Sequence, residues 1–136
     1  MEKINIIEVK FIAHRLAKEL FEFNEPIPEF RTRFLNVLES CLAVPFQQFG
    51  SQPAYKGLIG KAAILFYLMI KNHPFQNGNK RIAMTTLLVF LYKNKKWLKV
   101  SDQELYNFAV WVAQSPPALN NAVVSGVEDF LKKYMV

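Results

Sequence analysis

The two longest apolar stretches of this chain stand on either side of a short polar segment, and no other feature constrains the fold as strongly. The first stretch, AAILFYLMI, runs without interruption from Ala62 to Ile70. The second, IAMTTLLVFLY, begins at Ile82. A helix that is apolar on nearly all sides belongs in the middle of a protein. We therefore predict two central helices, over residues 58–71 and 80–93, with the polar segment between them.

Apolar residues at spacings of three and four predict further helices around this centre. One such face comprises Val9, Ile12, Ala13, Leu16, Leu20 and Phe23, and a second comprises Phe30, Phe34, Leu35, Leu38, Cys41 and Leu42. The S-x-x-E spacing of Ser101 and Glu104 predicts a helix start, and Pro116-Pro117 predicts the start of the last helix. The expected fold is all-α: a single domain over residues 1–136, a bundle of about six helices, with a short extended flap within residues 46–57.

Composition narrows the class of partner. The single cysteine, Cys41, excludes a disulfide framework and suits a reducing cytoplasm. No apolar run reaches the length of about 18 residues that spans a bilayer, so we expect a cytoplasmic protein without a membrane partner. The formal net charge of +6 favours an acidic partner. A nucleotide, a nucleic acid and an acidic protein all stay open at this point.

The polar segment between the central helices, HPFQNGNKR, covers residues 73–81. Pro74 should end the first helix, since the residue before a proline is pushed out of the α region. Gly78 permits unusual backbone geometry, and Asn79 is a favoured helix cap. Lys80 and Arg81 would then lie at a helix N-terminus, where the unpaired amides and the dipole already attract anions. The expected ligand is a phosphate group.

His73 stands a few residues before this anion site, and histidine is well suited to exchange protons near neutral pH. Phe75, an apolar side chain, should anchor the segment in the core. A proton acceptor beside a phosphate site is typical of phosphoryl or nucleotidyl transfer. Taken singly, a helix-terminal histidine is more often a cap or a packed residue, and Lys-Arg is more often solvated surface. Two cations in a first turn nevertheless oppose the helix dipole and call for an anion.

The segment resembles the Fic/Doc signature H-P-F-x-[DE]-G-N-[GK]-R, and it agrees at eight of nine positions if x is free. The stretch RFLNVLESCLAVPFQQFG, over residues 33–50, is similar to the death-on-curing (Doc) branch. The resemblance extends over about residues 6–115. It implies a helical fold and an enzyme, a protein AMP- or phosphotransferase, that uses ATP or another nucleoside triphosphate with Mg²⁺. The acceptor would be a hydroxyl of a protein target, in the Doc branch a translation factor.

The resemblance also implies a role for each residue of the motif. His73 would be the catalytic base, Phe75 the loop anchor and Asn77 the metal ligand. The residues that would bind the nucleotide phosphates are Gly78, Asn79, Lys80 and Arg81. Residues 50–56 stand where the family has a flap that aligns the target chain.

One departure from the family pattern concerns the metal. The signature has Asp or Glu where this chain has Asn77, and an amide oxygen carries no formal charge for a hard cation. The alternative to a transferase is therefore a non-catalytic module that binds a nucleotide, a nucleic acid or a partner protein. No [ST]-x-x-x-E-[GN] inhibitory motif occurs in the 136 residues. This favours the toxin of a toxin–antitoxin pair, with a separate antitoxin as its partner.

Two further features bear on partners. The segment KNKKWLK, residues 93–99, places four lysines around Trp97. Basic residues mixed with aromatic ones can bind nucleic acid, but we favour a solvated turn with Trp97 folded onto the core. His14 is expected at the surface or in packing and not as a ligand.

Overall fold

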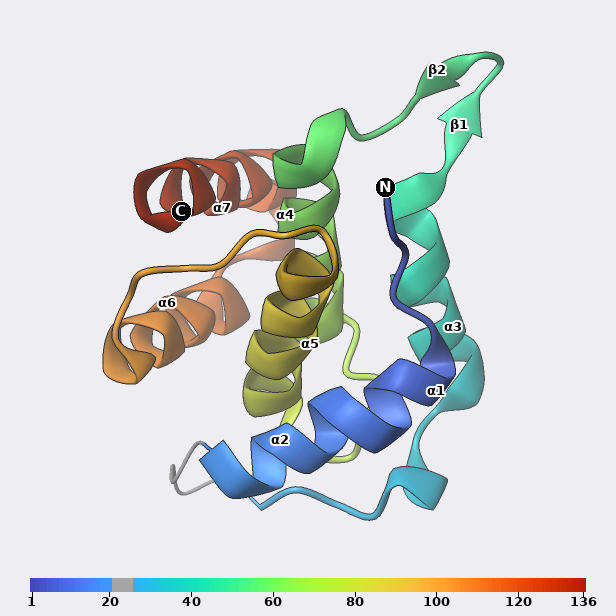
Figure 1. Cartoon of the computed structure of the whole chain (residues 1–136), viewed down its shortest axis with the longest axis vertical. Helices are drawn as coiled ribbons and strands as arrows, with labels where there is room; N and C mark the ends of the chain where they lie inside the picture. The colour runs from blue at the N-terminus through green and yellow to red at the C-terminus, as the bar shows by residue number, and fades with distance from the viewer. Residues whose placement is uncertain (21–25) are drawn as a thin grey trace.

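The computed structural model describes residues 1–20 and 26–136, and the prediction of an all-α fold is confirmed. The helices are α1 (Ile6–Glu8), α2 (His14–Leu20), α3 (Leu35–Ala43), α4 (Gly57–Lys71), α5 (Asn79–Lys93), α6 (Asp102–Gln114) and α7 (Asn120–Tyr134) (Figure 1). A π-helical turn, Val9–Ala13, joins α1 to α2. Short 3-10 turns stand at Phe30–Thr32, Val44–Phe46 and Pro117–Leu119. Within residues 1–20 and 26–136 no helix combines the length and apolarity that a bilayer crossing requires.

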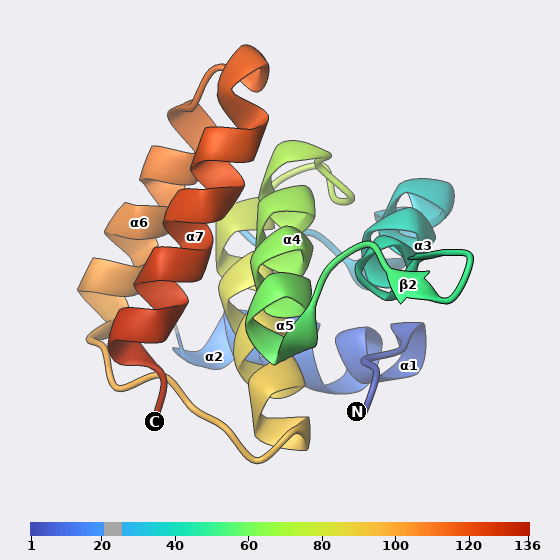
Figure 2. The same ribbon diagram turned by 90° about the horizontal axis from the view of Figure 1, so that it is seen from above.

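Helices α4 and α5 form the centre of the molecule, as their sequences predict. In Figure 2, α6 and α7 cover them on one side, and the first helix and α3 lie on the other. Side chains on several sides of α4 and α5 are fully buried, among them Leu65, Met69, Ile82 and Phe90. These two helices therefore position the polar segment that connects them.

The two predicted outer faces are correct only in part. Val9, Ala13 and Ala17 are buried, but Ile12 is 42% exposed because the π-helical turn rotates the buried face of the first helix. Phe34 and Leu35 are also largely exposed, since a 3-10 turn separates Phe30 from α3 and breaks the single helical register. Phe23 and the side chain of Leu20 lie outside the described residues.

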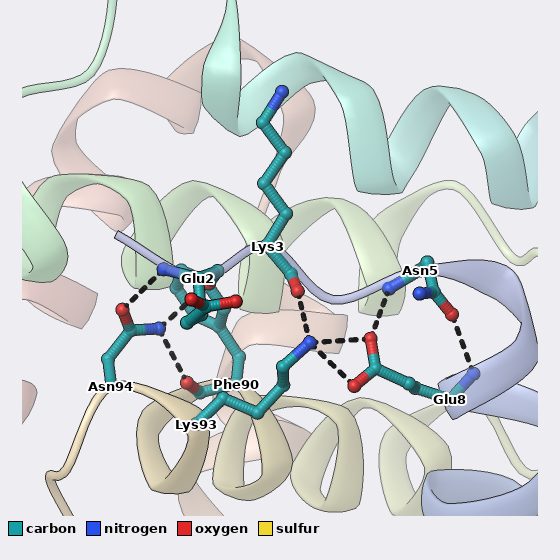
Figure 3. A network of polar contacts seen from close by, with 7 residues as sticks. All are labelled: Glu2, Lys3, Asn5, Glu8, Phe90, Lys93 and Asn94. Atoms are coloured by element: carbon teal, nitrogen blue, oxygen red, sulfur yellow. Dashed lines mark hydrogen bonds and ion pairs between the residues drawn. The ribbon is translucent and has the colours of Figure 1, made fainter.

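The N-terminal segment is fastened to the C-terminal end of α5 (Figure 3). Asn94 exchanges two hydrogen bonds of 2.9 Å with the backbone of Glu2. Lys93 pairs with Glu8 at 2.5 Å, and both side chains are mostly buried. Glu8 also completes a capping box with Asn5 at the start of α1. The first helix is thereby held against the central helix that follows the motif.

A hairpin of two short antiparallel strands, β1 (Gln48–Phe49) and β2 (Gln52–Pro53), precedes α4, so the expected extended flap forms. Gly50 has φ +63° at the first position of its two-residue turn, where a type II′ turn favours glycine. The hairpin leads into the N-terminus of α4 and the motif segment leaves its C-terminus (Figure 1). Fifteen residues of helix separate the two by about 20 Å.

Candidate functional site

His73 lies just beyond the end of α4. The helix ends at Lys71, Asn72 is its C-cap, and His73 follows with φ +49° and an exposed side chain. A left-handed residue after a helix terminus stops the helix, and glycine is the usual choice there. A histidine in this conformation costs roughly 1–3 kcal/mol, which is typical of functional sites. The imidazole is thereby presented to solvent at the junction of α4 and the motif segment.

Asn79 organises the segment through its side chain. Its Oδ1 accepts a hydrogen bond from the Phe75 amide at 3.0 Å, and its Nδ2 donates to the Phe75 carbonyl at 2.9 Å. The prediction that Asn79 caps α5 is wrong, because Gly78 occupies the N-cap position and Asn79 is the first helical residue. Its amide group satisfies the buried peptide groups of Phe75 instead. Asn79 thus fixes the shape of the loop from inside.

The same amide group reaches the imidazole. Asn79 Nδ2 lies 3.4 Å from His73 Nδ1, and an amide nitrogen can only donate. In this arrangement a neutral His73 carries its own proton on Nε2. A neutral imidazole that accepts a proton at Nε2 must already carry its other proton on Nδ1. Base catalysis through Nε2 therefore requires His73 to break its long, weak contact with Asn79 and to donate from Nδ1 to a hydrogen-bond acceptor.

Gly78 meets a strap formed by residues 26–28. Its backbone has φ +72°, and a Cβ atom at this position would lie 2.7 Å from Ile27 Cδ1 and 3.0 Å from the Pro26 carbonyl oxygen. Both the conformation and the close approach of backbone require glycine here. The strap therefore covers the entrance of α5, where Gly78, Asn79 and Arg81 are all buried.

Phe75 and His14 hold the strap and the loop together. Phe75 is 1% exposed, and its ring lies 5.8 Å from the rings of both His14 and Phe30. His14 Nε2 is 2.7 Å from the Pro28 carbonyl and donates to it. Burial lowers the pKa of His14 below its ordinary value, outweighing the opposite effect of this hydrogen bond. His14 is therefore a packing residue with a structural hydrogen bond, one of the two roles expected from the sequence.

The two motif cations have different surroundings. Arg81 is 7% exposed and donates from Nη2 to the Ala17 carbonyl of α2 at 2.5 Å. Lys80 is partly buried at the second helical position of α5. Both follow Gly78 directly in the first turn, where the amides lack carbonyl partners within the helix. Both cations therefore stand in the first turn of α5, but the Arg81 guanidinium is buried against α2, and phosphate binding by these residues stays a prediction.

Asn77 offers little to a metal ion. Its side chain is exposed, and its Oδ1 accepts a 2.8 Å hydrogen bond from the Gly78 amide. Across residues 1–20 and 26–136 no three His, Cys, Asp or Glu side chains gather as a possible metal centre. Mg²⁺ in nucleotide sites takes most of its ligands from phosphates, water and one or two carboxylates. The motif segment contains no carboxylate and can offer only neutral oxygens, so these residues fit Mg²⁺ only weakly.

A shallow groove of about 380 Å³ opens beside Asn72, the residue before His73. It is lined by Asn36, Val37 and Ser40 of α3 and by Asn72 at the end of α4. A hydrogen bond of 2.9 Å from the Phe34 amide to the Pro74 carbonyl ties α3 to the motif segment. Three of its four lining residues carry polar side chains, although most of the lining surface is apolar.

The strap and the groove were not predicted from the sequence. Pro26 and Pro28 both fix φ and limit the paths the strap can take, but no local sequence pattern places the strap against Gly78. His14 stood on the predicted first helix near Arg15 and Lys18, and nothing in that local pattern pointed to Pro28. A contact between residues 14 and 28 depends on the return of the chain, which periodicity does not describe.

Comparison with known proteins addresses the family directly. The family model "Fic/DOC family" matches residues 3–91, which include α1 to α5 except the last two residues of α5. Neither the curated proteins nor the solved structures contain a match to the chain. The matched range holds the entire motif segment and both helices that position it. On this match over well more than half of its length, the chain belongs to the Fic/DOC family.

Proposed function

We propose that the protein is a Doc-like toxin that transfers a phosphate or an AMP group from a nucleoside triphosphate to a hydroxyl of a protein target. The observation that carries this proposal is the presentation of His73, strained and exposed at the end of α4, beside an α5 N-terminus that carries Lys80 and Arg81. A general base and an anion site so placed suit group transfer at phosphorus. A translation factor is the class of target we propose.

In the proposed reaction His73 accepts the proton of the target hydroxyl after its ring leaves Asn79. The hydroxyl oxygen forms a bond to the γ- or α-phosphorus, and the bond from that phosphorus to the leaving ADP or pyrophosphate breaks. Lys80, Arg81 and the first-turn amides of α5 neutralise negative charge on the phosphates. The target side chain would approach along the groove of Asn36, Ser40 and Asn72. Mg²⁺, when bound, would shield the triphosphate, with Asn77 as its ligand from the motif.

The β1–β2 hairpin takes no part in this proposal. The family resemblance assigns a target-aligning flap to this stretch, but here the hairpin lies at the far end of α4 from His73. Contact between a target held at the hairpin and the imidazole would require a segment about 20 Å long. The α3 groove is nearer and is the surface we assign to the target.

The test is a transfer assay with ATP labelled at the α- or the γ-phosphate, Mg²⁺ and a cell lysate. Label from the γ-position alone identifies phosphate transfer, and label from the α-position identifies AMP transfer. His73→Asn should reduce either signal by about 10²–10⁴-fold while the fold survives, because asparagine tolerates a positive φ. A Gln76→Ala variant, changed at an exposed position of the same loop, is the matched control and should retain transfer. Equal labelling by His73→Asn and the parent would refute the assignment of the base.

Asn77 favours a second candidate, a non-catalytic module that binds a nucleotide, nucleic acid or partner protein in the same place. The weak fit to Mg²⁺ supports it. Calorimetry and the transfer assay together distinguish the two candidates. A module that binds ATP gives a calorimetric signal but no labelled product with any lysate. Binding without transfer, at all Mg²⁺ concentrations, would favour the module.

The toxin reading also includes a separate antitoxin and a cytoplasmic location. A short reading frame next to this one, whose product suppresses growth arrest on co-expression, would support the pair. Growth arrest that persists with His73→Asn would argue against a toxin that acts by group transfer.

A further inference from the structure

We propose that the loop after α5 forms a binding surface for single-stranded nucleic acid, built from Tyr92, Lys95, Lys96, Trp97 and Lys99. Four of them, Tyr92, Lys95, Lys96 and Trp97, line a hollow of about 630 Å³ together with Lys93 and Val136. The surface lies at the opposite end of α5 from the motif, about 20 Å away along the helix. It is independent of the proposed transfer reaction.

The two aromatic residues of this surface are both exposed to solvent. Tyr92 is 73% exposed and Trp97 is 46% exposed, so the prediction that Trp97 folds onto the core is wrong. Their ring centroids are 6.3 Å apart, and the planes meet at 86°. In such a T-shaped pair each partner covers little of the other, which leaves ring faces available. A nucleobase can stack on an exposed aromatic face, whatever its identity.

Three exposed lysines accompany the rings. Lys95, Lys96 and Lys99 all reach solvent, whereas Lys93 is engaged by Glu8 and does not count toward the surface. No Asp or Glu occurs from residue 93 to residue 101. Lysines spaced along a loop next to stacking rings match the alternation of phosphate and base in a nucleic acid strand.

The loop is held in one shape, which lowers the entropy cost of binding. Lys95 takes a left-handed conformation with φ +63°, and the Lys96 amide bonds back to the Leu91 carbonyl at 2.9 Å. Beyond the turn, the Val136 amide donates to the Trp97 carbonyl at 2.9 Å. The Lys99 amide donates to the Tyr134 carbonyl at 2.8 Å. Both ends of the basic stretch are therefore anchored to the folded body.

The rings favour a single strand over other anions. A duplex hides its base faces, and neither lipid headgroups nor carboxylate side chains offer a flat ring to stack on Tyr92 or Trp97. An apolar groove of about 550 Å³ adjoins the surface, with Ile12, Leu16, Leu88 and Val89 in its lining. A peptide that combines acidic and apolar residues could use both, so it is the rival that the experiment must exclude.

The experiment measures fluorescence anisotropy of labelled oligothymidylate and oligouridylate, each of about twelve nucleotides, with the full chain. We expect a Kd of about 10⁻⁵ M at low salt and a slope of log K against log salt near −2 for about three phosphates. Comparing the two oligonucleotides decides between DNA and RNA. A blunt duplex, polyglutamate, an acidic amphipathic peptide and phosphatidylserine vesicles serve as competitors and should displace the strand poorly.

Two variants separate the contributions of charge and stacking. Lys95→Asn with Lys96→Gln should reduce the salt slope to about −0.7, and asparagine suits the left-handed conformation of position 95. Trp97→Leu should weaken binding about tenfold without changing the slope. Lys10→Gln with Lys18→Gln, which removes the same charge from the first helix, is the control and should leave binding nearly unchanged. Equal loss in the control, or binding of the duplex, peptide or vesicles as strong as that of the single strand, would overturn the proposal.

Discussion

His73 and Gly78 both have positive φ, and together they give the motif segment its shape. Gly78 has no side chain to strain, whereas His73 holds a conformation that a glycine would adopt at lower energy. A strained residue persists only where its surroundings determine it. The Asn79 side chain holds His73 in this conformation, because it hydrogen-bonds to the amide and the carbonyl of Phe75 and also contacts the imidazole.

The strap contact at Gly78 can be measured against another glycine. Gly78→Ala should destabilise the fold by about 2–4 kcal/mol, because the methyl group collides with the Pro26 carbonyl and because the positive φ strains any residue with a Cβ atom. Gly57 also has positive φ but has no atom within 4 Å of its would-be Cβ, so Gly57→Ala should cost only about 1–2 kcal/mol. Urea unfolding gives both values. Equal costs would mean that the strap does not press on Gly78.

Asn77 stands where the Fic/Doc signature has Asp or Glu. In Asn77→Asp one carboxylate oxygen can keep the hydrogen bond from the Gly78 amide, and the other gains a charge for a cation. If the protein is a transferase, the Mg²⁺ dependence of transfer should move to lower concentration. Without Mg²⁺, the added charge should weaken ATP binding, because it repels the phosphates. A magnesium titration with unchanged transfer and unchanged ATP affinity would place Asn77 away from the metal.

At the scale of elements, the sequence predicted those helices whose signals are local. The central helices begin and end within about one residue of their predicted bounds. The Ser101 hydroxyl accepts a hydrogen bond from the Glu104 amide, as the S-x-x-E spacing implies. The failures involve distant parts of the chain or a change of helical register. Trp97 is exposed in a loop that pairs with the distant Val136, and Ile12 is exposed because of a π-helical turn. Periodicity carries no information on either.

The strap gives a prediction about pH, because its anchor is a buried histidine. The pKa of His14 in the fold lies below the ordinary value of 6.5, so the unfolded chain binds the proton more readily. Stability should therefore be intact above about pH 6.5 and fall as the pH drops below it. His14→Gln, whose amide can donate to Pro28, should flatten this dependence between pH 5 and 7.5 in urea midpoints. His73→Asn is the control for the chain's other histidine, and the slope it retains belongs to His14.

Both terminal segments are hydrogen-bonded to the C-terminal end of α5 or to the loop that follows it. The C-terminal residues pair with the loop after α5, and the N-terminal segment bonds to Lys93 and Asn94 at the end of the same helix (Figure 3). Both sets of contacts lie at or just beyond the C-terminal end of α5, whereas the motif lies at its N-terminal end. The contacts of both terminal segments are therefore separated from the candidate site by the length of α5.

The ion pair of Lys93 and Glu8 should contribute measurably to this arrangement. Its side chains are only 22% and 21% exposed, whereas those of Arg15 and Glu19 are 76% and 58% exposed. Glu8→Gln preserves a capping-box residue at the start of α1 and removes only the charge. A double-mutant cycle of Glu8→Gln with Lys93→Met should give a coupling of about 1–2 kcal/mol that weakens little in salt. The same cycle on Arg15 and Glu19 should give about 0.3–0.5 kcal/mol and vanish in salt. Equal couplings for the two pairs would mean that the N-terminus is held by Asn94 and the buried Ile4 and not by charge.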